Sequence, residues 1–179
     1  MNENLEAQVP RLLAYEEIRQ LAARYAVSIG RLDVAALAEL FVDDVRVPGG
    51  GSGRAAFTQA MAAMLAQSRI SILNVGTHAI ELLDPDHAEG VVYCHAEIGD
   101  EREWIHQLIV YDDRYERRQG RWYFVGRRHR LVYGQRQERS PLDQPPAEWP
   151  RNAVGRGTAP MHWPSWQAFW AGAKGSGER

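Results

Sequence analysis

Two polar side chains with complementary chemistry lie two residues apart in the most regular strand pattern of the chain. Alternation with a period of two places Arg127 and His129 on one face of the segment 121–134, together with Tyr123, Val125, Leu131 and Tyr133. An imidazole titrates near neutral pH and can move a proton, and a guanidinium can hold a carbonyl, a carboxylate or a leaving group. This mixture of residue types is typical of a pocket wall rather than of a plain core.

Two further side chains are candidates for the same site. His78, in a predicted strand, can act as a base or donate to a substrate oxygen; the alternative is a strand histidine bonded to the backbone or to the C-terminal tail. Tyr25, in a predicted helix, can orient a substrate or a water molecule through its phenol, or it is a core tyrosine with a satisfied hydroxyl. Arg127 likewise has a structural alternative, an ion pair with Glu97 or Asp112.

The sequence predicts neither a metal site nor a cofactor. The six histidines are scattered and show no HxH, HxxxH or two-histidine-one-carboxylate spacing. The run from Gly49 to Gly51 lacks the lysine and the serine or threonine of a phosphate-binding loop, so we expect a flexible loop at the rim of a pocket.

Charge and composition exclude several functional classes. The chain of 179 residues has 21 basic and 23 acidic side chains, and its formal net charge of −2 argues against nucleic-acid binding. Lys174 is the only lysine and lies in a polar tail, which excludes a Schiff-base lysine in the core. Cys94 is the only cysteine, and the chain has neither a signal-peptide pattern nor an apolar run of about 20 residues. We therefore expect a cytoplasmic protein that binds no membrane.

The elements that must position these residues begin with helices. Apolar periodicity predicts a helix over 12–29, a short helix capped by Asp33, and a third helix that opens at Ser52 or Gly53. A brief strand is predicted at 45–47, between the second and third helices. Strand patterns then cover 70–83, with a bend or bulge at Gly76, and 88–98, and end in a hairpin over 104–134 that turns at Gln119-Gly120.

This order of elements predicts an α+β fold with the helices packed on one face of an antiparallel sheet. Strands of about a dozen residues accumulate twist, so we expect a curled sheet whose concave side is filled by a helix or a ligand. In the strand 88–98, Tyr93, His95 and Glu97 share a polar face, which we expect at solvent or at an interface.

The C-terminal part of the chain differs in composition. Residues 140–170 hold six of the nine prolines and four of the six tryptophans. Disordered segments are poor in aromatic residues, so this segment is predicted to be ordered without much regular structure. We expect a domain over 1–139 and an extension over 140–179 that wraps on the domain or on a dimer partner.

Three segments together resemble the SnoaL-like branch of the nuclear transport factor 2-like superfamily: RYAVSIGRLDVAALAELFVDD, GTHAIELLDPDHAEGVVYCHAE and YDDRYERRQGRWYFVGRRH. This family includes ketosteroid isomerase, scytalone dehydratase, polyketide cyclases and a dehydrochlorinase. The resemblance implies a cone, in which a strongly curved sheet wraps around helices and encloses an apolar pocket. It also implies cofactor-free chemistry and a homodimer, which we expect to form through the sheet face.

The catalytic Asp–His pair of the family's dehydratases is missing from the matching positions. The aspartate position near the end of the first helix holds Gly30, although the second acid of that motif is present at Asp33. The histidine position holds Leu73 or Asn74, depending on one residue of slippage. Glycine has no proton to exchange, and asparagine cannot act as a general base near neutral pH.

Two functions remain open at this stage. The first is a lyase or isomerase that eliminates from, isomerises or hydrates a small, hydrophobic, oxygenated molecule, with His78 and His129 as catalytic residues. Tyr25, Asn74 and Arg127 would bind its substrate, whose identity the sequence does not give. The second is a non-catalytic ligand-binding or assembly module on the same fold.

Overall fold

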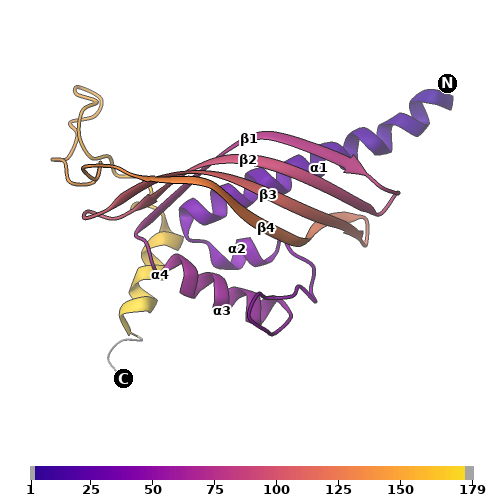
Figure 1. Ribbon diagram of the computed structural model, residues 1–179, viewed down its shortest axis with the longest axis horizontal. Helices are drawn as coiled ribbons and strands as arrows, with labels where there is room; N and C mark the ends of the chain where they lie inside the picture. Colours follow the sequence, from indigo (N-terminus) through magenta and orange to yellow (C-terminus); the bar gives the residue numbers. More distant parts are fainter. Residues whose placement is uncertain (1–2, 176–179) are drawn as a thin grey trace.

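Four long strands form one antiparallel sheet in the computed structural model, which describes residues 3–175. The strands follow one another in space as they do in the chain: β1 (Ile70–Leu82), β2 (His87–Gly99), β3 (Trp104–Arg118) and β4 (Arg121–Arg136). The sheet is strongly curved, as the length of its strands predicts (Figure 1). The turn between β3 and β4 lies at Gln119-Gly120, where both residues have positive φ (52° and 80°), as a two-residue hairpin turn of this kind requires.

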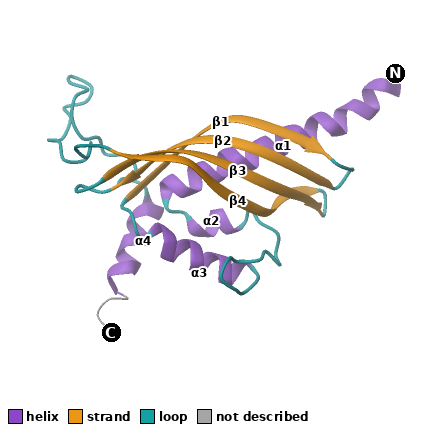
Figure 2. Ribbon diagram, in the orientation of Figure 1, coloured by secondary structure: helices purple, strands orange, loops and turns teal. Residues whose placement is uncertain are grey.

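Three helices lie on the concave side of the sheet, and a fourth follows the long loop after β4 (Figures 1 and 2). They are α1 (Glu3–Arg31), α2 (Val34–Ala38), α3 (Arg54–Leu65) and α4 (Pro164–Gly175). Asp33 caps α2 as predicted, because its carboxylate accepts a hydrogen bond from the Ala36 amide at 3.0 Å. The predicted start of the first helix at residue 12 was wrong. The N-terminal part of α1 extends beyond the strands and exposes Leu12 and Leu13, so apolar periodicity carries no signal for where it begins.

Bulges interrupt the alternation of both edge strands. The pairing of β1 with β2 shifts between Val75 and His78, which confirms the irregularity expected at Gly76. In β4, Val125 and Val132 are extra residues, because the pairing passes from Phe124 to Gly126 and from Leu131 to Tyr133 while β3 advances by a single residue.

These bulges change which residues of β4 face the helices. Trp122 and Phe124 take the buried positions before the first bulge, and Arg127, His129 and Leu131 take the concave side after it. The predicted face therefore holds for Arg127, His129 and Leu131, whereas Tyr123 and Tyr133 do not belong to it. An extra residue in a strand moves every later side chain to the opposite face.

The main core lies between α1 and the sheet. Ile18, Leu21 and Tyr25 of α1 are buried with Tyr115 and Phe124 of the sheet. The segment after α2 runs along the edge of β4, where the Val42 amide donates to Phe124 O (3.0 Å) and the Phe124 amide donates to Leu40 O (2.9 Å). The expected brief strand at 45–47 is reduced to a single bridge between Arg46 and Ser52.

The C-terminal segment contacts the rest of the chain through α4 and through the loop that precedes it. Trp166 of α4 is 8% exposed, and its indole nitrogen donates to Arg69 O at 3.3 Å. Ser165 donates to Arg31 O at 2.8 Å, which fixes the start of α4 against the end of α1. Leu142 packs on Trp104 and Ile70 in a separate small cluster. None of the described helices is long and apolar enough to cross a membrane.

Candidate functional site

A cavity of about 860 Å³ lies between the helices and the concave side of the sheet. Its apolar wall is formed by residues of α1, α3, the segment between α2 and α3, and all four strands: Ile29, Phe41, Val45, Phe57, Met61, Met64, Leu65, Leu73, Ile98, Ile109 and Val125. The polar groups that line it include Tyr25, Tyr111, Arg127 and His129. A mostly apolar cavity with a few converging polar groups is typical of a small-molecule site.

Arg127 is a buried cation held by one carboxylate. Its side chain is 4% exposed and that of Asp113 is 0% exposed. The guanidinium donates from Nε to Asp113 Oδ1 (2.8 Å) and from Nη2 to Asp113 Oδ2 (2.6 Å). Burial alone would lower the pKa of Arg127, but the hydrogen bonds and charge of Asp113 offset it and the pKa is raised. The group is therefore a permanent cation.

One nitrogen of this guanidinium remains without a partner. Arg127 Nη1 is buried and makes no hydrogen bond to any described residue. The guanidinium carbon lies 4.3–4.5 Å from the ring centres of Tyr25, Tyr111 and Phe124, which restrict its movement. The guanidinium is therefore a fixed cation in the wall of the cavity, and its Nη1 is enclosed by these rings without an acceptor.

Two phenols add further donors beside this guanidinium. Burial raises the pKa of both Tyr25 and Tyr111, so both stay protonated at neutral pH. Within residues 3–175, no hydrogen bond is made by either hydroxyl, although both residues line the cavity. Each can donate to an oxygen atom that enters the cavity.

His129 supplies the titratable group. It is the one histidine among the described residues that lines this cavity, and its ring lies 5.5 Å from that of Tyr111. Partial burial lowers the pKa of His129, so that the neutral imidazole dominates at neutral pH. A neutral imidazole at the side of an apolar cavity can accept a proton from a bound molecule.

His78 does not line the cavity, so its predicted role as a base there does not fit its position. The bulge in β1 turns His78 toward the helices, where its Nε2 lies 3.0 Å from Tyr115 Oη. Tyr115 in turn donates to Asp113 Oδ2 at 2.8 Å. Gly90 lies against this tyrosine, and a Cβ there would be in tight contact with the Tyr115 ring, at 3.0 Å. His78 thus reaches the site only through Tyr115 and Asp113.

Asn74 does not fit its predicted role as a substrate ligand either. It pairs with His95 of β2 on the outer face of the sheet, and both residues are exposed. The preceding residue, Leu73, lines the cavity instead. Alternation along β1 places neighbouring residues on opposite faces, so only one of the two could face the cavity.

Three participants were missed by sequence reasoning: Tyr111, Asp113 and Tyr115. They lie at alternate positions of β3, so alternation would have placed all three on the face of Ile109. The sequence predicts Glu97 or Asp112 as the structural partner of Arg127, but the bulge at Val125 shifts the hairpin register by one residue. Asp113 rather than Asp112 is therefore opposite Arg127.

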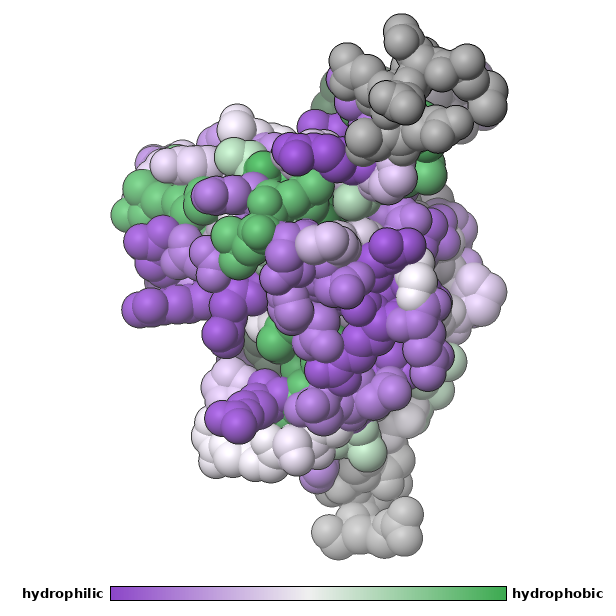
Figure 3. All heavy atoms as spheres, turned by 90° about the vertical axis from the view of Figure 1, so that its right-hand side faces the viewer, coloured by the Kyte–Doolittle hydropathy of each residue, from purple (hydrophilic) through white to green (hydrophobic). Residues whose placement is uncertain are grey.

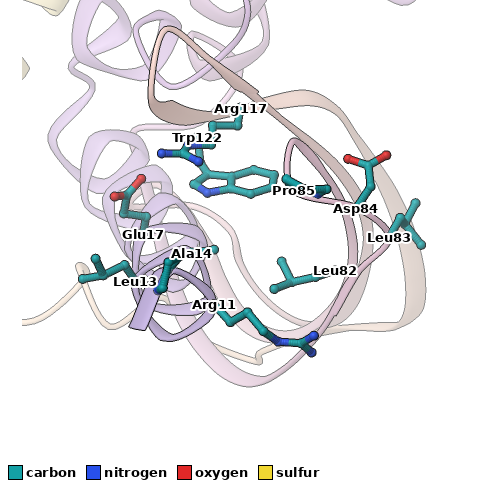
Figure 4. A pocket seen from close by; sticks show the side chains of 11 residues that line it. Arg11, Leu13, Ala14, Glu17, Leu82, Leu83, Asp84, Pro85, Arg117 and Trp122 are labelled. Carbon is teal, nitrogen blue, oxygen red and sulfur yellow. The ribbon is translucent and has the colours of Figure 1, made fainter. Parts of the chain in front are cut away.

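A second, smaller cavity of about 590 Å³ lies between the N-terminal half of α1 and the turn that joins β1 to β2. Figure 4 shows the indole of Trp122 facing it, with Leu82 below and Glu17 and Asp84 on either side. Figure 3 looks onto this end of the molecule and shows hydrophobic residues in its upper part and mainly hydrophilic ones below. This cavity contains none of the predicted site residues and no buried charge, so we take the larger cavity as the candidate site.

No group of three or more His, Cys, Asp or Glu residues within 3–175 is arranged to hold a metal ion. At the positions that the resemblance assigns to a catalytic pair, α1 carries Gly30, and β1 carries Leu73 in the cavity wall and Asn74 on the outer face. A Cβ at Gly30 would lie 3.6 Å from Ser71 O, an ordinary contact. The cavity instead presents Arg127, the two phenols and His129 among its polar groups.

Comparison with solved structures gives many similar folds. A hexachlorocyclohexane dehydrochlorinase from Novosphingobium barchaimii LL02 superposes with a TM-score of 0.66 at 20% identity, over 73% of this chain and 94% of that one. A candidate scytalone dehydratase from Novosphingobium aromaticivorans gives 0.63 at 20% identity, over 72% and 90%. A nuclear transport factor 2-like protein with a cystatin-like fold, also from Novosphingobium aromaticivorans, gives 0.60 at 26% identity, over 74% and 90%.

The sequence-level comparisons complete the assignment. No curated protein sequence matches the chain significantly. The family of SnoaL-like domains, by contrast, matches residues 10–128, which include every residue of the Asp113–Arg127 site except His129. The curved sheet over N-terminal helices agrees with the fold of the structural neighbours. The chain therefore belongs to the SnoaL-like domain family of the nuclear transport factor 2-like superfamily.

Proposed function

We propose that the protein is a cofactor-free lyase or isomerase that acts on a small, hydrophobic, oxygenated molecule in the larger cavity. The observation that carries this proposal is the buried guanidinium of Arg127, whose Nη1 has no partner among the described residues. A fixed, buried cation in the cavity wall would stabilise negative charge that develops on a substrate oxygen nearby. The enzymatic chemistry named for the structural neighbours also supports it.

Arg127 and the phenols would stabilise negative charge that develops on a substrate oxygen. The hydroxyl of Tyr25 or Tyr111 would donate to a carbonyl oxygen, and the charge of the Arg127 guanidinium beside these rings would stabilise the oxygen's negative charge. Asp113 would act as a positioning residue, because its two hydrogen bonds fix the direction of the guanidinium. Fixed donors in a cavity shielded from water are the most effective form of such stabilisation.

His129 would move the proton. Its neutral imidazole would take a proton from the carbon next to the carbonyl, and the C–H electron pair would form an enolate with its charge on the oxygen. The imidazolium would then return the proton, either to a departing hydroxyl group, which gives elimination, or to another carbon, which gives isomerisation. Hydration is the reverse of the elimination. No electron acceptor is needed in any of these steps.

The test uses β-hydroxy ketones and β,γ-unsaturated ketones, whose conversion to conjugated enones is followed by ultraviolet absorption. For a substrate that is turned over, His129→Gln should lower kcat about 10²-fold or more, the usual contribution of a general base. Tyr25→Phe and Tyr111→Phe should each lower it less, because the other donors remain. His95→Gln, on the outer face, is the matched control. Unchanged turnover in His129→Gln would reject this assignment of the base.

A non-catalytic ligand-binding module is the second candidate function. It is favoured by Gly30 and by Leu73 or Asn74, which stand where the resemblance implies an acid and an imidazole. It predicts that a conjugated or saturated ketone binds tightly to the cavity and is recovered unchanged after long incubation. Clear product formation that depends on His129 would exclude it.

A further inference from the structure

A pair of serine hydroxyls lies at one end of the larger cavity. Ser71 is the second residue of β1, Ser68 lies in the turn that precedes this strand, and both residues line the cavity. Ser71 is 7% exposed, and the two hydroxyl oxygens are 3.1 Å apart, within hydrogen-bond distance. Leu65, the last residue of α3, and Ile98, opposite Ser71 on β2, are their apolar neighbours in the cavity wall. The pair is therefore a polar group in a mainly apolar part of the cavity.

This hydroxyl pair has a hydrogen to spare. Two hydroxyls carry two hydrogens, and the bond between Ser68 and Ser71 uses one of them. Neither side chain makes another hydrogen bond within residues 3–175, so the second hydrogen has no acceptor in the described chain. A hydroxyl group in the wall of an apolar cavity gains free energy when a bound molecule supplies the missing partner. Because hydroxyl oxygens also accept, the pair can bind either a carbonyl or a hydroxyl group.

The serine pair and the phenols belong to opposite ends of the cavity. A Cβ at Gly30 of α1 would lie 3.6 Å from Ser71 O, so Gly30 marks the serine end of this helix. Tyr25 precedes Gly30 by about 7.5 Å along the helix axis, at a rise of roughly 1.5 Å per residue. Helical side chains also lean toward the N-terminus, which takes the Tyr25 hydroxyl further from Ser71.

The sheet separates the polar groups in the same direction. Ser71 lies opposite Ile98 of β2, and Tyr111 lies opposite Val92 of the same strand. An extended strand rises about 20 Å from Ile98 to Val92. Since the sheet curves around the cavity, the direct path is shorter, and helix and strand together give a separation on the order of 10–20 Å. Leu73, which pairs with β2 between these two positions, lines the cavity with an apolar side chain.

We infer that the molecule bound in this cavity is elongated and has two oxygen groups, one beside the phenols and Arg127 and the other, a hydroxyl or a carbonyl, at the Ser68–Ser71 pair. Where this molecule is the substrate, the inference rests on the proposed function. Its body would be a hydrocarbon of linked or fused rings, because the wall between the two polar groups is apolar. The second oxygen group would not react. It would determine which end of the molecule faces His129.

The test uses a pair of ketones that differ by a single hydroxyl group, 4-acetylbiphenyl and 4-acetyl-4′-hydroxybiphenyl. Both have a carbonyl at one end of an elongated hydrocarbon, and the second has a hydroxyl at the other end. Isothermal titration calorimetry of the whole protein should give about three- to tenfold tighter binding of the hydroxylated ketone, the usual gain from one hydrogen bond. The double variant Ser68→Ala/Ser71→Ala should lose this preference without binding 4-acetylbiphenyl more weakly.

Two further variants separate the ends of the cavity. Ser52→Ala, at an exposed serine that does not line the cavity, is the matched control and should keep the preference. Tyr111→Phe acts at the carbonyl end, so it should weaken the binding of both ketones by a similar factor and leave their ratio unchanged.

Equal affinity of the wild type for the two ketones would overturn the inference, as would failure of both to bind or a preference that survives in the double variant. The wild-type comparison needs no variant, and binding of 4-acetylbiphenyl by the double variant shows that this variant is folded. A preference for the hydroxylated ketone without turnover of any ketone would reject the proposed enzymatic function and leave this inference standing; turnover without this preference would do the opposite.

Discussion

Asp113 and Arg127 lie opposite each other on β3 and β4, and two hydrogen bonds of 2.8 and 2.6 Å join their buried side chains. The adjacent residue pair, Asp112 and Arg130, forms a similar contact at the surface, with side chains 36% and 55% exposed. The hairpin therefore contains a buried and an exposed ion pair between the same two strands, which allows a matched comparison.

Asp113→Asn should lower the free energy of unfolding by about 3–5 kcal/mol, because it leaves the Arg127 charge buried without compensation. Asp112→Asn should lower it by less than about 1 kcal/mol, because water solvates the freed Arg130. Urea denaturation of both variants checks this prediction. Equal effects of the two substitutions would mean that the Asp113 pair is solvated in solution.

The rate of any reaction found should depend on the ionisation of His129. Partial burial lowers the pKa of this residue, so the neutral base persists below the ordinary histidine value of about 6.5. The rate should rise with pH through this lowered pKa and then level off. A pH profile of kcat measures it, and Tyr111→Phe should leave the position of the rising limb unchanged. A limb above the ordinary value would contradict the proposed role.

Stability should also fall in mildly acidic solution because of His78. Burial lowers the pKa of His78 in the folded state, so the unfolded chain binds a proton at a higher pH than the folded chain. The stabilising contribution is complete above about pH 6.5 and is lost as the pH falls through the folded-state pKa. His78→Gln should therefore show a weaker pH dependence of the unfolding free energy than the wild type. An identical dependence would show that other groups cause the loss.

The C-terminal segment should contribute to stability through one tryptophan and not through another. Trp166 is 8% exposed and packs in the main core, whereas Trp149 is 76% exposed. Trp166→Ala should cost about 3–5 kcal/mol, and Trp149→Ala should have little effect. Thermal denaturation of the two variants distinguishes them. A small effect of Trp166→Ala would indicate that α4 does not pack on the domain in solution.

The outer face of the sheet exposes several apolar residues that a partner could cover. Ile72, Val91, Tyr93 and Tyr133 are between 38% and 47% exposed on this face. We expect a homodimer through the sheet, and Tyr93→Arg should yield a monomer in sedimentation velocity experiments. Leu83→Arg, at an exposed apolar residue outside this face, should leave the dimer intact. A monomeric wild type would reject the expectation.

The parts of the fold with local signals could be predicted from sequence. Asp33 signals the start of α2, and Gln119-Gly120 signals the hairpin turn; both are determined by neighbouring residues. The arrangement of the site could be predicted less well. The bulges at Val125 and Val132 involve β-branched residues that fit a regular strand equally well, and the nearby Gly126 and Gly134 do not reveal which residue is the extra one. A prediction that does not include these bulges cannot pair Asp113 with Arg127, and it places Tyr123 on the same face as Arg127.

The extra residue at Val125 has a consequence for comparing relatives and for redesign. Distances counted along the chain from the hairpin turn transfer to another protein only if that protein has the same insertion. Deleting Val125 would rotate the rest of the strand by half a turn, with Arg128 and Arg130 directed inward and Arg127 and His129 directed to water. Superposed coordinates, not residue spacing, are thus the sound basis for transferring roles, and lengthening or shortening this strand by one residue is a direct way to switch the site on or off.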